Sequence, residues 1–340
     1  MIEESHVGLH HVSACGYARR GSDDIAFGTL EETLDDILRW SRGKTLGETN
    51  LVNPNEEGEG AYLLDARTWN GRYLLSIWNP VPSTNGQVAS VRTDSGVNEP
   101  AVVMNRIEAG TIPGFATYFY FVPARALLAC VRFQHRTYAQ GRMRLFVRAF
   151  LRYCGRHVVY DDDDESGEPR LVGYSADGND EPRWAKQVFV AEPCVREGEF
   201  EMLVREAPRI AKVLRKTELD LRTPAELATW QHLLRALHLG QQARPQDPVR
   251  LQFAMDGHVT GDQVGEIIAD WQRGDFGGDD WEDVGFSMTG ETSKVHWLSH
   301  ALARQAIDLD VARDSAEVVN ANSLIRRLYQ NEAAILLALG

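Results

Sequence analysis

Residues 62–80, YLLDARTWNGRYLLSIWNP, carry the strongest local indication of the fold. Two apolar runs, at 61–67 and 72–79, stand on either side of the dipeptide Asn70-Gly71. Asparagine and glycine accept the positive φ angles that a two-residue hairpin turn requires. The pattern therefore predicts a β-hairpin, and with it an antiparallel sheet in the N-terminal half of the chain.

The sequence around this hairpin predicts two helices and more strands. Thr29 and Glu32 form a capping box at the start of a helix over 29–42, in which leucine and isoleucine recur at helical spacing. Residues 1–160 are therefore expected to form a β-rich α+β domain. Its second helix is expected at 140–154, and its other strands at 5–18, 101–107, 115–122 and 126–134.

An acidic stretch at 161–183 indicates a boundary between two domains. It begins with four aspartates and a glutamate and continues with Gly, Pro and Asp. Such dense like charge is typical of a solvated linker or loop. Residues 184–340 are then expected to form a smaller α+β C-terminal domain. Its predicted strands are 184–191, 249–255 and 283–288, and its predicted helices are 207–217, 224–238, 262–272 and a long final helix, 315–339.

The bulk composition is that of an ordinary globular protein. The chain has 340 residues, of which 43% are hydrophobic and 25% charged. No apolar run approaches the roughly 20 residues of a membrane span, and the N-terminus lacks the apolar core of a signal peptide. A cytoplasmic location without membrane contact is therefore expected. The net charge of −13, taken alone, argues against a general nucleic-acid binder.

Familiar catalytic patterns are incomplete. Gly43-Lys44-Thr45 imitates the end of a P-loop, but Leu38 stands where that motif requires glycine. No lysine stands two residues after a carboxylate, which is the spacing found in restriction-type nucleases. A non-enzymatic protein is favoured, and an unrecognised hydrolase or nuclease stays open as an alternative.

The sequence also lacks a complete metal-binding or cofactor-binding motif. His6 and His10, like His296 and His300, have the four-residue spacing with which zinc binds one helix face. The first pair lies in a predicted strand, and the second lacks the intervening glutamate of a metalloprotease helix. The four cysteines are far apart in the sequence and are expected to be small buried hydrophobes. No metal and no cofactor is predicted.

One segment departs from the acidic background. Between Ala109 and Tyr160 there is no Asp or Glu in 52 residues, and eight arginines give the segment a net charge of +8. Since the whole chain carries −13, the remainder carries −13 − 8 = −21. Arginine forks match the oxygens of phosphate, so the segment predicts a surface for a polyanion.

The arginines of the predicted helix 140–154 form a stripe. Arg144, Arg148 and Arg152 recur every four residues, which places them on one helix face opposite the apolar residues. A second, smaller stripe is expected on the predicted helix 207–217. The candidate nucleic-acid-binding residues are therefore Arg132, Arg136, Arg142, Arg144, Arg148, Arg152, Arg156, Arg209, Lys212 and Lys216.

Other interpretations of the charge pattern remain. The arginines can pair with acids of the same chain, such as those at 161–165 and 279–283, or with an acidic partner chain. The protein can also be an interaction module or an inhibitor whose acidic surface meets a basic partner. These alternatives predict no affinity for nucleic acid.

The order of the elements resembles that of the RexA-like phage-exclusion proteins. The resemblance lies in the YLLDARTWNGRYLLSIWNP hairpin, in IPGFATYFYFVPARALLACVRF followed by the helix LFVRAFLRYC, and in a long terminal helix. The chain departs from that family in its length, its acidity and the stretch at 161–183. The resemblance implies a non-enzymatic, dimeric protein that binds DNA largely without sequence preference and acts in phage–host conflict. It assigns a role to no individual residue.

Overall fold

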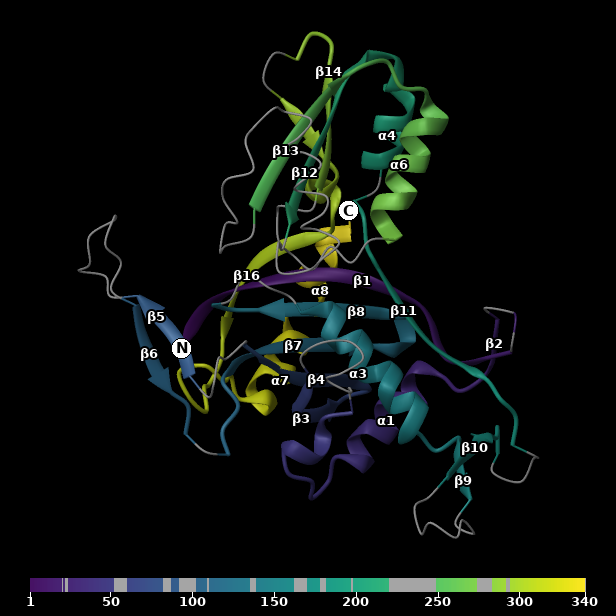
Figure 1. The fold of residues 1–340 in the computed structure, drawn as a ribbon, viewed down its shortest axis with the longest axis vertical. Coiled ribbons are helices and arrows are strands. Elements are labelled where there is room, and N and C mark those ends of the chain that lie inside the picture. The colour runs from purple at the N-terminus through teal and green to yellow at the C-terminus, as the bar shows by residue number, and fades with distance from the viewer. Residues whose placement is uncertain are drawn as a thin grey trace. The chain divides into compact units, whose positions relative to one another are not determined.

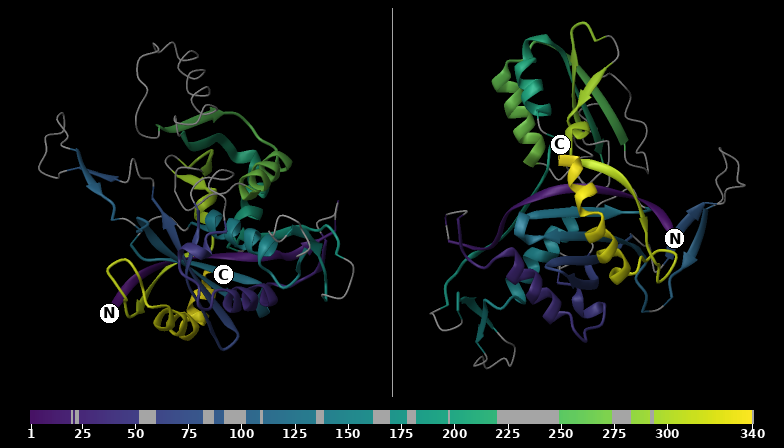
Figure 2. Two further views of the ribbon diagram at one scale, coloured as in Figure 1. Left: turned by 60° about the horizontal axis from the view of Figure 1, so that its bottom comes forward. Right: turned by 180° about the vertical axis from the view of Figure 1, so that it is seen from behind.

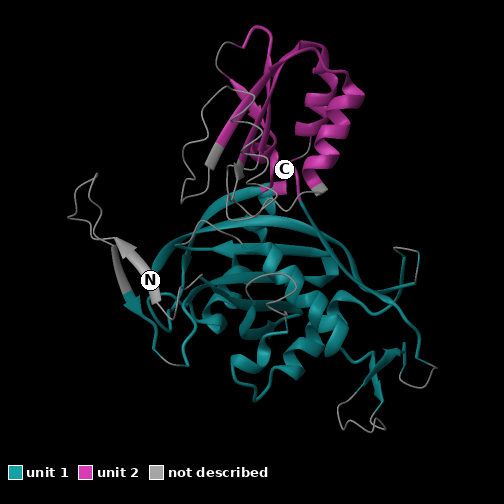
Figure 3. Ribbon diagram, in the orientation of Figure 1, with its two compact units in different colours: residues 1–193, 304–338 teal, residues 194–303, 339–340 magenta. Residues whose placement is uncertain are grey.

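The computed structural model combines helices with antiparallel sheets (Figure 1), which confirms the α+β class. It divides into two compact units, coloured separately in Figure 3. Unit 1 comprises Met1–Pro193 and Arg304–Ala338, and unit 2 comprises Cys194–Ala303 and Leu339–Gly340. The structure describes residues 1–19, 21, 24–51, 60–81, 87–91, 102–108, 110–134, 139–161, 170–177, 182–196, 198–219, 249–273, 283–291 and 294–339.

Unit 1 is built on an eight-stranded antiparallel sheet. Its main path runs in the order β11-β1-β8-β7-β4-β3, and β2 and β16 also pair with β1. The central strand β1, with 17 residues, is the longest of the described strands. The strands are β1 (Ile2–Ala18), β2 (Ile25–Phe27), β3 (Tyr62–Trp69), β4 (Arg72–Pro80), β7 (Gly114–Val122), β8 (Leu127–Arg132), β11 (Lys186–Pro193) and β16 (Arg304–Asp310).

Two of these strands follow one another along a single edge of β1. Pro193, at the end of β11, lies opposite His10, and Arg304, at the start of β16, lies opposite Gly8. β8 pairs with His10 and Gly8 as well, so it occupies the other edge. β11 and β16 therefore act as one strand that is interrupted by residues 194–303.

The predicted hairpin is present as β3 and β4. Trp69 lies opposite Arg72, and the two turn residues between them, Asn70 and Gly71, have φ angles of 50° and 70°. Both angles are positive, as this tight turn requires. The strands predicted at 5–18, 101–107, 115–122 and 126–134 are present too, and β6 (Val102–Arg106) pairs with β5 (Gln87–Val91).

Helices cover both faces of this sheet (Figures 1 and 2). On one face, α1 (Leu30–Trp40) and α3 (Gln140–Tyr153) pack over Phe119 and Phe121 in the main core. The intervening residue Tyr120 points to the other face, because side chains alternate along a strand. There its hydroxyl meets α8 (Glu332–Leu336), which follows α7 (Ala321–Gln330).

Local capping signals place two of these helices. Thr29 accepts a hydrogen bond from the Glu32 N–H at 3.2 Å, and its hydroxyl donates to the Glu32 carboxylate, which confirms Thr29 as the predicted N-cap of α1. Asn320 accepts from the Ser323 N–H at 3.0 Å and begins α7. The 3₁₀ turns of the described chain are η1 (Gly47–Thr49), η2 (Pro123–Arg125), η3 (Ala207–Arg209), η4 (Leu298–Ala301) and η5 (Leu337–Leu339).

Unit 2 has a four-stranded antiparallel sheet with helices packed against it. The strand order is β13-β12-β14-β15, and the core holds Trp271 and Phe286. Phe200 of α4 meets Trp271 of α6 edge to face. The elements are α4 (Glu199–Arg205), β12 (Ile210–Leu219), β13 (Val249–Asp256), α6 (Gly261–Arg273), β14 (Asp283–Met288) and β15 (Val295–Trp297).

The division into units differs from the predicted boundary at 161–183. β9 (Val158–Asp161) and β10 (Arg170–Tyr174) form a hairpin whose Tyr174 is buried in the core of unit 1. The chain then continues into β11 of the same sheet, and residues 304–338 return to it. Pairing between strands so distant in sequence leaves no trace in local composition. Residues 162–169 and 178–181 lie outside the described part of the chain.

One predicted helix is wrong, and another is shorter than predicted and divided in two. Residues 210–219 form the strand β12, although Ile210 and Leu214 are buried as the helical interpretation required. A spacing of four keeps residues on one face in a helix and in a strand alike. The final helix over 315–339 begins only after its cap at Asn320 and is divided at Asn331 into α7 and α8. The helix predicted at 224–238 lies outside the described residues.

Candidate nucleic-acid interface

The arginines of α3 differ in how much their side chains contact other residues of the protein. Arg142 donates from Nη1 to the Pro80 carbonyl at 3.0 Å, which ties the start of the helix to the end of β4. Arg144 is half-buried, and its charge acts on the His10 ring and the Cys130 thiol of the underlying sheet. Neither side chain is available in full to a ligand.

Arg148 and Arg152 remain exposed on the outer face of α3. Among the described residues neither guanidinium forms an ion pair. Arg152 lies over the ring of Tyr153, 5.0 Å from its centroid, and its backbone carbonyl accepts from the Tyr174 hydroxyl at 3.3 Å. The predicted stripe is therefore reduced to two solvent-facing arginines one helical turn apart.

Arg156, which the sequence placed in the binding set, is engaged by an acid of the same chain. Its Nε lies 3.0 Å from both carboxylate oxygens of Asp36, and its backbone N–H donates to the same group. Asp36 on α1 is only 7% exposed, and Arg156 and Arg39 both pair with this buried carboxylate. Arg132 is half-buried at the end of β8, and Arg136 lies outside the described residues.

Lys44, which the sequence did not nominate, extends the basic surface beyond α3. Its ammonium group lies 5.2 Å from the centre of the Trp40 ring. That ring packs edge to face against Phe150 of α3, with centroids 5.5 Å apart. The end of α1 thus places a lysine beside the arginine helix. The sequence signal would have been the tryptophan that closes the apolar face of the helix 29–42, four residues before Lys44.

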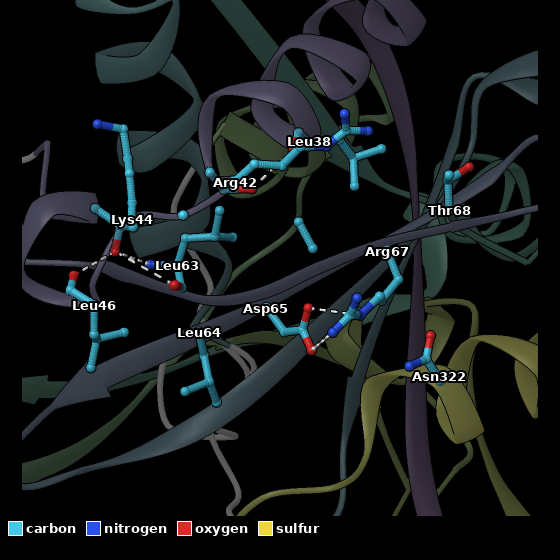
Figure 4. A pocket seen from close by; sticks show the side chains of 14 residues that line it. Leu38, Arg42, Lys44, Leu46, Leu63, Leu64, Asp65, Arg67, Thr68 and Asn322 are labelled. Carbon is cyan, nitrogen blue, oxygen red and sulfur yellow. Dashed lines mark hydrogen bonds and ion pairs between the residues drawn. The ribbon is translucent and has the colours of Figure 1, made fainter.

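A pocket of about 610 Å³ continues from Lys44 along β3 (Figure 4). Among the described lining residues, Arg42, Lys44 and Arg67 stand against a single carboxylate, that of Asp65. Arg67 is held by that carboxylate, with Nε–Oδ1 at 2.9 Å. The described lining therefore has a net positive charge, which Arg42 and Lys44 supply.

The structure does not place Arg209, Lys212 and Lys216, the second predicted stripe, on one helix face. Arg209 pairs with Glu206 at 2.9 Å, and Lys212 on β12 pairs with Asp256 at 3.1 Å. Lys216, also on β12, lies 3.9 Å from the centre of the Trp297 ring. Because residues 210–219 form a strand, the three cations do not share a helix face. The predicted helical stripe is therefore absent, and a binding role for these three residues stays a prediction.

The described residues contain no cluster of three or more potential metal ligands among His, Cys, Asp and Glu. His6 and His10 lie on β1, where four residues span about 13 Å, too far to share one ion. His296 instead bonds Glu291 at 2.8 Å.

All four cysteines are free, and two of them, Cys15 and Cys130, are fully buried. Burial raises the pKa of the Cys15, Cys154 and Cys194 thiols to about 11. Burial also raises the pKa of Cys130. These thiols stay protonated near neutral pH and are poor nucleophiles.

No protein-family model matches the chain, and neither a curated protein nor a solved structure matches it. The resemblance to the RexA-like proteins therefore stays a prediction. In the portion of the chain that the structure describes, no helix is both long and apolar enough to cross a membrane.

Proposed function

We propose that the protein binds nucleic acid, most readily duplex DNA and without sequence preference, through phosphate contacts made by Arg148 and Arg152. The observation that carries the proposal is their exposure on α3 without a carboxylate partner in the described chain. Their neighbours Arg142 and Arg156, by contrast, are engaged by unit 1 itself. Guanidinium groups that face solvent free of local acids are suited to phosphate oxygens.

The surroundings of the two arginines support this proposal. Lys44 adds a third cation beyond the Trp40 ring, and Tyr153 and Tyr160 are exposed near the end of α3. The Tyr160 hydroxyl donates to the Tyr153 carbonyl at 2.8 Å, which holds both rings at this surface. The three cations together extend the surface on which the phosphates of a duplex can bind. Dimerisation and a role in phage–host conflict rest on the resemblance alone and stay predictions.

The test is the salt dependence of binding. Each phosphate contact on duplex DNA contributes about 0.9 to the slope of log affinity against log salt. The double variant Arg148→Ala/Arg152→Ala should therefore bind every duplex more weakly and flatten the slope by about two. Fluorescence anisotropy with a labelled duplex at a series of salt concentrations measures both quantities.

A matched control removes the same charge elsewhere. Arg106 and Arg205 are exposed on other elements, so Arg106→Ala/Arg205→Ala should leave the slope nearly unchanged. If the Arg148/Arg152 variant binds like the control, or if the unaltered protein binds no nucleic acid, the proposal fails. A loss of thermal stability with unchanged binding would show that the arginines serve the fold or an acidic partner instead.

A further inference from the structure

Among the described residues, the outer edge of β3 has backbone groups without hydrogen-bond partners. β3 ends the main path of the sheet, and the described part of the chain pairs it with β4 alone. The two-residue turn makes Trp69 and Arg72 a hydrogen-bonded pair. Going back along β3 from Trp69, every second residue therefore bonds to β4 through its backbone. The N–H and C=O groups of Ala66 and Thr68 consequently point away from β4.

A side chain already bonds this edge at its other end. The Leu63 N–H donates to the Thr49 hydroxyl at 3.0 Å, and Thr49 in turn donates to the Leu46 carbonyl at 2.6 Å. Thr49 thus serves as a substitute for a neighbouring strand at Leu63. No described residue does the same for Ala66 and Thr68, and an unpaired edge of this kind is a template for another strand.

The open edge lies in a groove. The pocket of about 610 Å³ is lined by six consecutive residues of β3, 63–68, by the turn 41–44 after α1, and by Asn322 of α7 (Figure 4). α1 packs on one face of the sheet and α7 on the other. The β3 edge is therefore flanked on both sides, and an extended chain fits along it.

The two sides of the groove differ in charge. On the side of α1, Arg42 and Lys44 line the pocket. Ala66 packs into the core beneath α1, so its neighbours Asp65 and Arg67 project to the α7 side, where they neutralise one another. The α1 side thus favours acidic side chains and the α7 side uncharged ones.

We propose that the edge of β3 binds an extended peptide segment of a partner protein by strand addition, and that the segment alternates acidic with uncharged residues. Ala66 and Thr68 supply two N–H donors and two carbonyl acceptors to the added backbone. Alternate side chains of the peptide point to the same face, so its acids meet Arg42 and Lys44 together. Main-chain hydrogen bonds provide the affinity, and Arg42 and Lys44 provide the specificity for acidic peptides. Other strand-addition sites divide affinity and specificity in the same way.

Two other occupants fit the groove less well. A second copy of the chain would bring its own β3 edge, flanked by its own helices, and two recessed edges cannot approach closely. It would also set Arg42 and Lys44 of one copy near those of the other. A nucleic acid can neutralise the two cations, but it has no regular array of amides to bond Ala66 and Thr68.

The decisive probe is a fluorescein-labelled octapeptide of alternating valine and glutamate, in three forms. One form is unmodified, one carries N-methyl groups on its valine amides, and one carries them on its glutamate amides. In an added strand only one of the two amide sets faces β3. One methylated form should therefore lose about tenfold or more in affinity, and the other should bind within about threefold of the unmodified peptide.

Variants of β3 locate the site. Thr68 is exposed, and Thr68→Pro removes the outward N–H at a position where an edge strand tolerates proline. It should weaken the unmodified peptide by about tenfold, whereas Thr68→Val keeps the N–H and should change affinity by less than about threefold. Arg42→Ala/Lys44→Ala should weaken binding as well, and the charge control Arg106→Ala/Arg205→Ala should not.

Several outcomes would overturn the proposal. Equal binding of the two methylated peptides would show an electrostatic site without strand addition. Absence of binding to every form, or unchanged binding in Thr68→Pro, would remove the β3 edge as the site. A change of oligomer mass in Thr68→Pro would assign the edge to a second copy. If Thr68→Pro does not fold, the methylated peptides still decide with the unaltered protein.

Discussion

His10 shows at the scale of a single residue how the basic segment acts inside the fold. Its ring lies on β1 beneath α3, with Nδ1 3.6 Å from the Cys130 thiol. Burial and the charges of Arg304 and Arg144 lower its pKa to about 4, although hydrogen bonds with Gly8 and Gln140 oppose the shift. The imidazole is consequently neutral in the folded protein near neutral pH. Arg144, an arginine nominated for phosphate, thus contributes to the lowered pKa of His10, after burial and Arg304.

A pH-dependent stability follows from this residue. In the unfolded chain the ring titrates near pH 6.5, so between about pH 6.5 and pH 4 the unfolded state binds a proton that the folded state excludes. The stability that neutral His10 contributes is present above that window and is lost as the pH falls through it. Urea unfolding at several pH values should show the loss, and His10→Gln should reduce it by about 1 kcal/mol per pH unit. Identical pH profiles for the two proteins would contradict this.

At the scale of elements, one ion pair attaches α8 to the sheet. Arg72 on β4 donates to the Glu332 carboxylate from Nε at 2.8 Å and from Nη2 at 2.9 Å. The Tyr120 hydroxyl donates to the same carboxylate at 2.8 Å. The hydrogen bonds from Arg72 lower the pKa of Glu332 despite its partial burial. A bidentate, partly buried pair of this kind is worth more than an exposed one.

This pair can be tested by a double-mutant cycle. Arg72→Met and Glu332→Gln should each lower the free energy of unfolding by roughly 2 kcal/mol, because each leaves a partly buried group without its partner. The double variant should cost less than the sum of the two, since neither change then leaves an unpaired charge. Chemical denaturation measures all four proteins. Additive losses would mean that α8 does not depend on this contact.

The elements also show what a sequence can predict. The β3–β4 hairpin and the N-cap of α1 were predictable, because Asn70-Gly71 and Thr29 with Glu32 act within a few residues. β12 was mistaken for a helix, because a spacing of four does not separate the two structures. In the candidate site, the stripe of α3 was predictable. The pairing of Arg156 with Asp36 was not predictable, because Asp36 lies 120 residues earlier in the chain. The β3 edge gives no local signal at all.

At the scale of the whole molecule, unit 2 is an insertion into a strand. Pro193 and Arg304 lie opposite His10 and Gly8, so a single residue opposite Leu9 would join β11 to β16. The chain enters and leaves unit 2 side by side, since the Ala303 N–H bonds the Cys194 carbonyl at 2.8 Å. Insertions with neighbouring ends are tolerated because the host fold does not need them.

Removing the insertion should therefore leave unit 1 intact. We expect a chain in which one glycine replaces residues 194–303 to be folded, to unfold cooperatively by circular dichroism, and to keep the nucleic-acid binding proposed for Arg148 and Arg152. The matched control is residues 1–193 alone, which lacks β16 and α7 and leaves Tyr118 and Tyr120 uncovered. Failure of the glycine-joined chain to fold would show that unit 1 requires unit 2.

The interrupted strand also constrains the order of events during synthesis. The first residues of β1 find their partner in β16, and Ser5 bonds the Ile307 carbonyl across a separation of 302 residues. At roughly 5–20 residues per second, a ribosome takes about 15–60 s to make the intervening chain. Throughout that interval one edge of the central strand is unpaired at its N-terminal end. The sheet of unit 1 can be completed only when almost all of the protein has been made, and the inserted unit sets the length of the delay.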